Sequence, residues 1–441
     1  MNTSPRPGAA LLALAALAAA CLTACARPPQ AGSVTVLGPW AGTERGTEGY
    51  AFRRIIAAFE AETGVHVTYQ DTRALPQVLL SNVQGGTPPN VAILSGVGEL
   101  ARYARAGDMF PLDGVVPPDR QAVFPRQWLL PQRDGSAEHI YTVPVKANLK
   151  SLVWFNRTQG PRPVPQTWAG LMAYTRSVVD RGGTPWCMGM GDPPSSGWPG
   201  TDLIEDILLR QAGPDAFQHL SAGVLPWNSG PMARAWTTWS TLVGPTQLRG
   251  GPHAAVLTDF QDAGRALFDD PPKCYLDHQA SFIMSFYQKY EHPVRPGVDF
   301  DFFPFPSFTP RPAEEPWEAS ADLAGMFDDT PQTRQFMRFL AGDEVSRIWA
   351  ESVSGAFSVN RNTDPRWYPD PVSKRIANVL ATKPLCLDAA DVMPAAMRAA
   401  FYRAVLEYLD GTKKSTVLLD ELEQIRRAIP TRDWTSLPCG R

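Results

Sequence analysis

The stretch that decides the fold begins with Ser33-Val34-Thr35-Val36-Leu37, a run of β-branched and apolar residues that ends at Gly38-Pro39. Gly64 stands where a C-terminal helix cap belongs, and Val65-His66-Val67-Thr68-Tyr69 follows it as a second β-prone run. Between the two runs, apolar side chains recur with helical spacing at Phe52, Ile55, Ile56 and Phe59. The sequence therefore predicts a strand, a helix and a second strand in direct succession.

A third β-prone run, Asn90-Val91-Ala92-Ile93-Leu94, stands further along the chain, and Leu100-Ala101-Arg102-Tyr103 belongs to a helix after it. Strand, helix, strand, strand and helix at this spacing predict an α/β layer with a mainly parallel sheet. The other expected elements are strands over 141–156, 281–287 and 299–305, and helices that begin at 165–168, at the cap Thr201 or Asp202 and at 330–331, or that span 417–429.

Length and composition limit the class of protein. A chain of 441 residues is too long for one ordinary domain and suits two domains or one large one. Its 44% hydrophobic and 19% charged residues are typical of a globular protein with a sizeable core. The 41 basic residues against 44 acidic ones argue against a nucleic-acid binder, which carries a basic excess on its binding surface. The 6 His residues form no HExxH motif, so neither a metal nor a cofactor is expected.

The first residues have the pattern of an export signal. Arg6 is followed by an apolar run over 9–20, which is too short to span a bilayer as a stable helix but suits the apolar part of a secretory signal. Leu22-Thr23-Ala24-Cys25 then resembles the bacterial lipobox, in which the cysteine is lipidated. We therefore expect a signal peptide over 1–24, a lipid anchor at Cys25 and a tether over 25–32. An ordinary signal peptide that happens to contain cysteines is the alternative.

Export changes what the cysteines imply, because disulfides persist outside the cell. Once the signal peptide is removed and Cys25 is lipidated, four cysteines remain, so two disulfides are expected in one of three pairings. We favour Cys187 with Cys274 and Cys386 with Cys439, since this pairing needs the fewest crossings. Buried free thiols are the alternative, and the lack of a CxxC pattern argues against a metal site.

Two catalytic or cofactor motifs are considered and given little weight. Gly96-Val97-Gly98-Glu99-Leu100-Ala101 fits the glycine pattern of a dinucleotide site, yet no acidic residue ends a following strand near position 118. A strand-to-helix turn whose amides meet a polar ligand is the simpler interpretation. Asp299 and Asp301 are among several carboxylate pairs, but spacing alone does not show the opposed geometry of a glycosidase. An exported glycosidase stays a remote alternative.

Aromatic residues stand at several turn positions. Trp40 follows the first strand, Trp198 lies in a turn-rich segment, and Phe286 and Tyr287 end the strand expected over 281–287. A sugar ring is held by aromatic stacking on its apolar face and by hydrogen bonds to its hydroxyls, because unpaired buried hydroxyls are costly. Core packing is at least as good an explanation for any single Trp, but their combination after strand ends favours a carbohydrate site.

A series of motifs runs through nearly the whole chain after the signal. They stand at residues 58–65, 86–92, 143–156, 183–187, 197–206, 274–282, 322–324 and 392–396, with Val143-Pro144-Val145-Lys146-Ala147-Asn148 and Gly197-Trp198-Pro199 among the more specific. These motifs resemble those of the extracellular solute-binding proteins of carbohydrate ABC importers, family 1, which includes maltose-binding protein. The similarity is greatest to the α-glucoside-binding branch, in which Cys187 and Cys274 fall where a disulfide occurs.

The resemblance implies an α/β, two-lobe, periplasmic-binding-protein-like (type II) fold with a hinge and an interlobe ligand cleft. On that pattern, lobe one covers 33–144 plus 305–352, and lobe two covers 147–302 plus 357–441. The first crossing between them is expected at 144–146. Such proteins do no chemistry, and ligand binding shifts an equilibrium between open and closed forms.

The resemblance also implies a set of ligand contacts from both lobes. Trp198, Trp40 and Tyr287 are expected to stack on the sugar, while acidic, lysine and amide side chains address its hydroxyls. The full set is Trp40, Glu44, Asp71, Ser95, Lys146, Asn148, Asp192, Trp198, Asp202, Phe286, Tyr287 and Asp322.

The implied function is a lipid-anchored, monomeric receptor on the extracellular face of the membrane. It would deliver a disaccharide or oligosaccharide, with an α-glucoside as the nearest candidate, to an ABC permease. Leu94-Ser95-Gly96-Val97 departs from the Pro-Gln-Pro-Gly that the branch usually has, which puts the α-glucoside in doubt. A binding protein or sensor for a different small polar ligand is the alternative.

Overall fold

The computed structural model describes residues 32–134, 136–308 and 315–440. The predicted signal peptide over 1–24, the lipid anchor Cys25 and the tether, apart from Gly32, lie outside the described residues. In the described part, no helix has both the length and the apolar character that a membrane crossing requires.

A mixed sheet forms the centre of the part of the molecule that contains the N-terminal strands. We call this part the first half and the remainder the second half. The strands of the mixed sheet are β1 (Ser33–Gly38), β2 (His66–Asp71), β3 (Val91–Leu94), β6 (Thr142–Leu149), β10 (Trp317–Met326) and β11 (Leu385–Leu387). The order is β11-β10-β3-β1-β2, and β6 also pairs with β10. β1 lies parallel to β2 and β3, whereas β10 is antiparallel to β3 and β6. The predicted α/β layer is therefore confirmed, with parallel pairing at β3-β1-β2 and between β10 and β11.

The helix predicted between the first two strands is α2 (Glu48–Thr63). The Thr47 hydroxyl caps its start by accepting a hydrogen bond from the Tyr50 amide at 3.1 Å. Gly64 ends it in the left-handed region at φ 69°, as expected of a glycine cap. The predicted apolar positions all face the core of this half, and they are Phe52, Ile55, Ile56 and Phe59.

A second, antiparallel sheet belongs to the other half. Its order is β8 (Asp277–His278), β7 (Leu152–Asn156), β9 (Phe300–Pro304). Because side chains alternate along a strand, Val153 and Phe155 face one apolar cluster while Trp154 faces the other. The helices around the two sheets are α3 (Leu75–Gln84), α4 (Val97–Ala106), α5 (Pro118–Gln121), α6 (Trp168–Asp180), α7 (Trp198–Ala212), α8 (Pro214–Ser221), α9 (Gly230–Leu242), α10 (Gly251–Leu257), α11 (Phe260–Ala263), α12 (Ile283–Tyr287), α13 (Pro331–Leu340), α14 (Asp343–Ser352), α15 (Pro371–Thr382), α16 (Ala389–Val392), α17 (Ala395–Leu409) and α18 (Ser415–Ala428).

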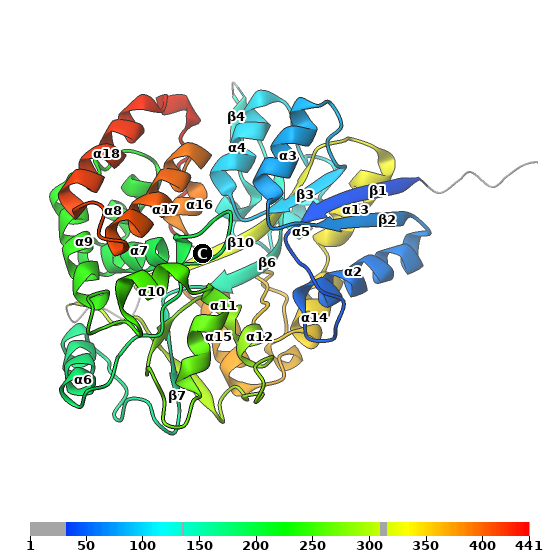
Figure 1. Cartoon of the computed structure of the whole chain (residues 1–441). Coiled ribbons are helices and arrows are strands. Elements are labelled where there is room, and N and C mark those ends of the chain that lie inside the picture. The colour runs from blue at the N-terminus through cyan, green and yellow to red at the C-terminus, as the bar shows by residue number, and fades with distance from the viewer. Residues whose placement is uncertain (1–31, 135, 309–314, 441) are drawn as a thin grey trace, which may run out of the picture.

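Strands β6 and β10 run through the middle of the molecule (Figure 1). On one side lie β1, β2, β3, α2 and α14, and on the other α7, α9, α17 and α18. β10 pairs with β11 through residues 317–319 and with β3 through residues 323–326, so a single strand links the two sides. The arrangement agrees with a two-lobe fold joined by chain crossings. The lobe boundaries given above stay a prediction.

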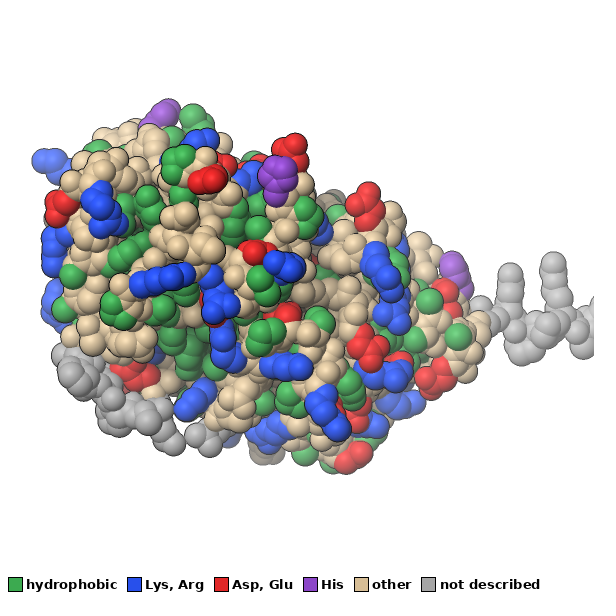
Figure 2. Space-filling model, turned by 90° about the horizontal axis from the view of Figure 1, so that it is seen from below, with side chains coloured by type: hydrophobic (Ala, Val, Ile, Leu, Met, Phe, Trp, Pro, Cys, Tyr) green, Lys and Arg blue, Asp and Glu red, His purple; other side chains and the backbone are tan. Residues whose placement is uncertain are grey.

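Short elements complete the chain. They are the 3-10 helices η1 (Arg126–Leu129), η2 (Gly264–Leu267), η3 (Pro365–Trp367) and η4 (Thr431–Asp433), and the hairpin strands β4 (Gln132–Asp134) and β5 (Ala137–His139). On the face seen from below, acidic and basic side chains are interspersed among hydrophobic ones (Figure 2).

Two predictions about local structure are wrong. The strand expected over 281–287 contains the short helix α12 instead, because an apolar run this short does not distinguish a strand from one helical turn. Helix α7 begins at Trp198, earlier than the predicted cap at Thr201 or Asp202. Gly197 at φ 106° admits a chain reversal that starts the helix. The predicted starts of α6 and α13 are confirmed, with Thr167 and Thr330 as caps.

The favoured disulfide pairing is confirmed. Cys187 and Cys274 are bonded with their Cα atoms 5.4 Å apart, and Cys386 and Cys439 with theirs 4.3 Å apart. The first bond joins the segment before α7 to the segment before β8. The second ties the C-terminal segment to β11. The first bond therefore restrains a loop of the second half, and the second fixes the C-terminal segment to a strand of the mixed sheet.

Candidate binding cleft

A cleft of about 600 Å³ lies between the two halves, and we call it the main cleft. Ten of the twelve predicted ligand residues line it. They come from the loops after β1 and β3, from the end of β2, from β6 and β10, from the turn before α7, and from α7 and α12. They are Trp40, Asp71, Ser95, Lys146, Asn148, Asp192, Trp198, Asp202, Phe286 and Asp322. Their contact with a ligand stays a prediction, but the fold does bring them together.

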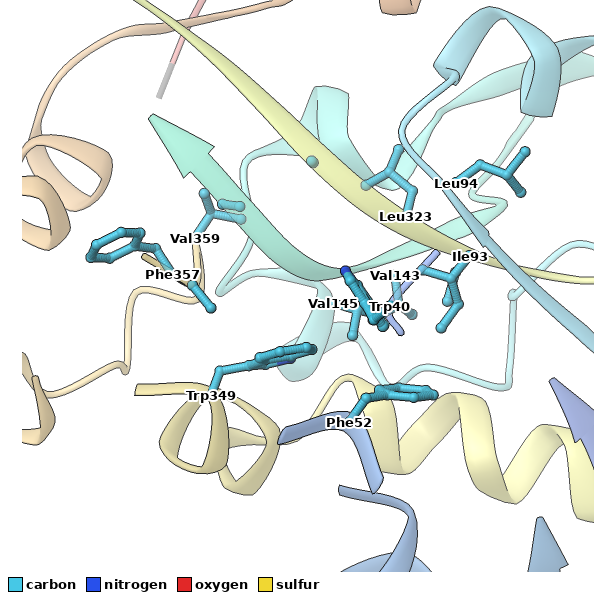
Figure 3. Packing of buried hydrophobic residues seen from close by; sticks show 14 of the residues in the cluster. Trp40, Phe52, Ile93, Leu94, Val143, Val145, Leu323, Trp349, Phe357 and Val359 are labelled. Atoms are coloured by element: carbon cyan, nitrogen blue, oxygen red, sulfur yellow. The ribbon is translucent and has the colours of Figure 1, made fainter. Parts of the chain in front are cut away.

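Trp40 lies at the cleft with its ring packed into the core. The side chain is 2% exposed, and its ring centroid lies 4.8 Å from that of Phe52 and 4.9 Å from that of Trp349. Figure 3 shows these three rings together beneath strand β6. A ring enclosed in this way does not offer a free face for stacking on a sugar, so the predicted stacking role does not fit its packing.

Tyr287 and Glu44 lie away from the cleft lining. Tyr287 is fully buried and donates a hydrogen bond from its hydroxyl to Asp277 Oδ2 at 2.7 Å, so it is a core residue. Neighbouring side chains point in different directions in a strand and in a helix alike, so Phe286 and Tyr287 could not both face one cleft. Glu44 is exposed, and Glu48 at the start of α2 lines the cleft in its place.

A buried lysine on β6 links three elements at the floor of the cleft. Lys146 Nζ lies 2.5 Å from Glu48 Oε1 on α2 and 3.1 Å from Asp322 Oδ2 on β10. Burial disfavours the charged form of Lys146, but the carboxylates of Asp322 and Glu48 outweigh it, and the pKa of Lys146 is raised. The amine is therefore positively charged at neutral pH, and it orders both carboxylates at the cleft surface.

Aromatic rings form one wall of the cleft. Trp198 lies 5.0 Å from Phe260 and 5.8 Å from Phe282, and Phe286 lies 5.6 Å from Phe260, measured between ring centroids. Trp198 Nε1 donates to Asp192 Oδ2 at 2.9 Å, which fixes the indole relative to that carboxylate. Burial raises the pKa of Asp192, against the effect of the Trp198 hydrogen bond. An apolar wall beside an oriented polar group suits a ligand with both apolar and hydroxyl faces.

A second buried lysine, Lys150, gathers carboxylates beneath the other end of the floor. Its Nζ lies 2.8 Å from Asp202 Oδ2 and 3.8 Å from Glu318 Oε1, and it also bonds to Asp388. Burial, and then the charge of Asp388, raises the pKa of Asp202 to about 8 in spite of Lys150. The three carboxylates could together hold a metal ion by their spacing. The ammonium group of Lys150 already supplies the cation among them, so they carry no case for a metal.

The glycine motif at 96–98 brings the two halves into close contact. A Cβ on Gly98 would lie 2.2 Å from the Met393 carbonyl oxygen, and one on Gly96 would lie 2.3 Å from Arg398 Nη1. Arg398 in turn donates to Glu99 Oε2 at 3.2 Å. The motif is the strand-to-helix turn that the sequence indicated, and its glycines serve contact between α4 and the start of α17.

Asn148, on the cleft lining, has a buried polar atom without a partner among the described residues. Asn148 on β6 is 5% exposed and donates from Nδ2 to Ser320 Oγ at 3.4 Å, while its Oδ1 accepts no hydrogen bond. A buried carbonyl oxygen of this kind is costly unless a donor reaches it. Its place on the cleft lining points to a ligand that carries a hydrogen-bond donor.

The sequence model of the bacterial extracellular solute-binding proteins matches residues 43–263. A relative in Synechocystis sp., the osmoprotective compounds-binding protein GgtB, is 32% identical over 417 residues, covering 90% of this chain and 94% of that protein. The chain belongs to the bacterial extracellular solute-binding protein family. The alpha-glucosides-binding periplasmic protein AglE of Rhizobium meliloti is 30% identical over 407 residues, covering 87% of this chain and 85% of that one.

Solved structures agree with the fold of this solute-binding protein. One described as a chitin oligosaccharide binding protein superposes with a TM-score of 0.71 at 16% identity, covering 90% of this chain and 98% of that chain. The solute receptor AcbH superposes with a TM-score of 0.70 at 19% identity, covering 90% and 99% of the two chains. The family is that of the extracellular solute-binding proteins. The predicted two-lobe α/β fold is confirmed.

Several cleft residues of this solute-binding protein were missed from the sequence. Lys150 stands two residues after Asn148 in the same motif and could have been found from that spacing. Phe282 ends the motif at 274–282 and could have been found there, whereas Phe260 stands outside the motifs. Three charged residues after β11 also line the cleft, namely Asp388, Asp391 and Arg398. Nothing in the sequence distinguishes them from charged residues exposed to solvent.

Proposed function

We propose that the chain captures a disaccharide or oligosaccharide in the main cleft and presents it to the permease of an ABC transporter. The observation that carries the proposal is the pairing of the aromatic wall at Trp198 with buried, oriented polar groups at Lys146 and Asn148. Sugars combine apolar ring faces with hydroxyls, so they need both kinds of contact at once. The cleft residues named above, apart from the core residue Trp40, are the proposed ligand contacts.

The names of the relatives support this class of ligand. AglE is named for α-glucosides and GgtB for osmoprotective compounds, and the structural neighbours include a chitin oligosaccharide binding protein. An α-glucoside is the first candidate for this chain. A smaller osmoprotective solute is the second candidate, because GgtB covers as much of the chain as any relative described here.

Ligand binding is proposed to stabilise a closed form, with no chemical step. Contacts across the cleft in this structure indicate where closure would be held. Arg73, after β2, lies with Nη1 3.5 Å from Asp192 Oδ1 and 4.0 Å from Asp259 Oδ2 in the other half. A ligand shifts such an equilibrium only by its difference in affinity for the two forms. The proposed lobes are 33–144 plus 305–352 and 147–302 plus 357–441.

The position of the protein in the cell is also a proposal. Cleavage after residue 24 and lipidation of Cys25 would tether a monomer to the extracellular face of the membrane. Metabolic labelling with a radioactive fatty acid tests this directly. The native protein should carry label and partition with membranes, and a Cys25→Ala variant should lose both properties.

Calorimetric titration and thermal unfolding with a sugar panel test the ligand class. The panel contains maltose, trehalose, sucrose, glucosylglycerol and glycine betaine. A ligand at 100 times its Kd should stabilise the protein by about 2.7 kcal/mol. Stabilisation by a disaccharide supports the proposal, and stabilisation by glucosylglycerol or glycine betaine alone supports the smaller osmoprotective solute. A protein that responds to none of them would contradict both. Unchanged sugar after prolonged incubation is the expected control against hydrolysis.

A further inference from the structure

A second hollow of about 300 Å³ opens beside the main cleft, and we call it the side pocket. Ser285 and Lys289, both from the α12 region, line the side pocket and the main cleft. The two spaces therefore adjoin along one edge of α12. None of the predicted ligand residues lines the side pocket, so it is separate from the site that the sequence indicated.

The side pocket is built from both halves of the molecule. Arg45 and Gly46 come from the loop before α2, Glu351 and Ser354 from the end of α14 and the turn after it, and Gln288 from the end of α12. A Cβ on Gly46 would have no atom within 4 Å, which shows how open the space is there. Like the main cleft, the pocket lies where material from the two halves meets.

The lining of the side pocket offers donors and acceptors together. Arg45 and Lys289 are donors, Glu351 is an acceptor, and the hydroxyl of Ser354 can act as either. The end of α14 adds carbonyl oxygens, since the last turn of a helix leaves these without partners inside the helix. A surface that mixes donors and acceptors in this way is complementary to a hydroxyl-rich group rather than to an apolar one.

Lys289 connects this lining with the aromatic wall of the main cleft. Its Nζ lies 5.3 Å from the centre of the Phe286 ring, which faces the main cleft. Burial lowers the pKa of Lys289, against the opposing effect of Glu48 and Glu44. The side chain therefore stands at the junction, beside the ring on one side and the side pocket on the other.

We propose that the side pocket holds a further sugar unit of a ligand whose first units lie in the main cleft. The inference rests on the proposed function and narrows it to oligosaccharides longer than a disaccharide. The ligand would pass along α12 beside Phe286, Ser285 and Lys289. Its last unit would form hydrogen bonds with side chains of the side pocket, namely Arg45, Glu351 and Ser354.

Matched pairs of sugars that differ by one unit test the inference. The native protein is titrated with maltose and maltotriose, and with sucrose and raffinose. In the pair that binds, the longer sugar should bind about tenfold more tightly, which corresponds to one additional well-placed unit. Equal affinity for the two members of the pair that binds would overturn the inference while leaving the proposed function intact. Failure of these four sugars and of trehalose to bind would overturn both.

Filling the side pocket gives the second arm of the experiment. Ser354→Trp should remove the gain from the longer sugar and leave the affinity for the disaccharide unchanged, because Ser354 lines only the side pocket. Ser354→Ala keeps the side pocket open, so this variant should retain at least half of the native increase in affinity from the shorter to the longer sugar. Glu351→Trp, at an exposed position on the same lining, repeats the test if Ser354→Trp unfolds. A Trp variant that binds both sugars as the native protein does would overturn the inference.

Discussion

At the scale of single residues, neighbours in space decide between binding and packing. Trp40 and Trp198 both follow turns and both were expected to stack on a ligand. Trp40 is enclosed by Phe52 and Trp349, whereas Trp198 is only partly buried and tied to Asp192 at the cleft. A sequence shows the type of a residue and its position relative to the strands. It does not show which distant aromatic residue, such as Trp349 beside Trp40, packs against it.

The two tryptophans therefore predict opposite outcomes on truncation. Trp198→Ala should weaken ligand binding about tenfold or more, with a loss of stability of about 1 kcal/mol. Trp40→Ala should lower the free energy of unfolding by about 3–5 kcal/mol, because it leaves a large cavity in the core. Urea unfolding and calorimetric titration of both variants measure these effects. Equal destabilisation by the two substitutions would show that Trp198 is a core residue as well.

At the scale of elements, hydrophobic periodicity predicted the first strands and helices well. The apolar stripe of α2 and its glycine cap lie as expected, since local sequence fixes both the face and the end of an amphipathic helix. Periodicity failed at α12, where one helical turn and a short strand give the same pattern. Periodicity also gives no information on which elements contact one another. The reason for Gly96 and Gly98 at the start of α4 is therefore seen only in the structure, where they contact the segment that joins α16 to α17 and the start of α17.

That contact yields a prediction for helix α4. Gly98→Ala places a methyl group against backbone at Met393, 2.2 Å from the carbonyl oxygen, so the two elements must separate. We expect a loss of about 1–3 kcal/mol in the free energy of unfolding, as for overpacking in a core. Gly244→Ala is the matched control, since its nearest neighbour would lie 3.9 Å away, and it should change stability by less than about 1 kcal/mol. Denaturant unfolding that gives the same midpoint for both variants would contradict this account.

At the scale of the whole molecule, the family resemblance predicted the two-lobe fold and supported the disulfide between Cys187 and Cys274, which is confirmed. The charge arrangement at the cleft floor was not predictable. Lys150 collects acids from α7, β10 and α16, which are brought together only by folding. Because these acids come from separate segments, the stability of the cleft floor depends on all of them together and cannot be assigned to one sequence motif.

The buried acids predict how the stability of the molecule depends on pH. Burial raises the pKa of Asp202 to about 8 and that of Asp391 to about 7, and it raises that of Asp277, below Tyr287, to about 7. Such a group binds its proton more tightly in the folded chain than in the unfolded one. Its contribution is therefore complete below the unfolded pKa of about 4 and is lost as the pH rises through the folded value.

The free energy of unfolding should accordingly be larger at pH 6 than at pH 8.5, as measured by urea unfolding at a series of pH values. Asp277→Asn should reduce the slope, because the amide resembles the neutral acid and cannot ionise. Asp180→Asn, at an exposed position at the end of α6, should leave the slope as it is. A stability that rises from pH 6 to pH 8.5 in the native protein would mean that Asp202 and Asp391 are ionised in the folded chain, with Lys150 and Arg398 outweighing the cost of their burial.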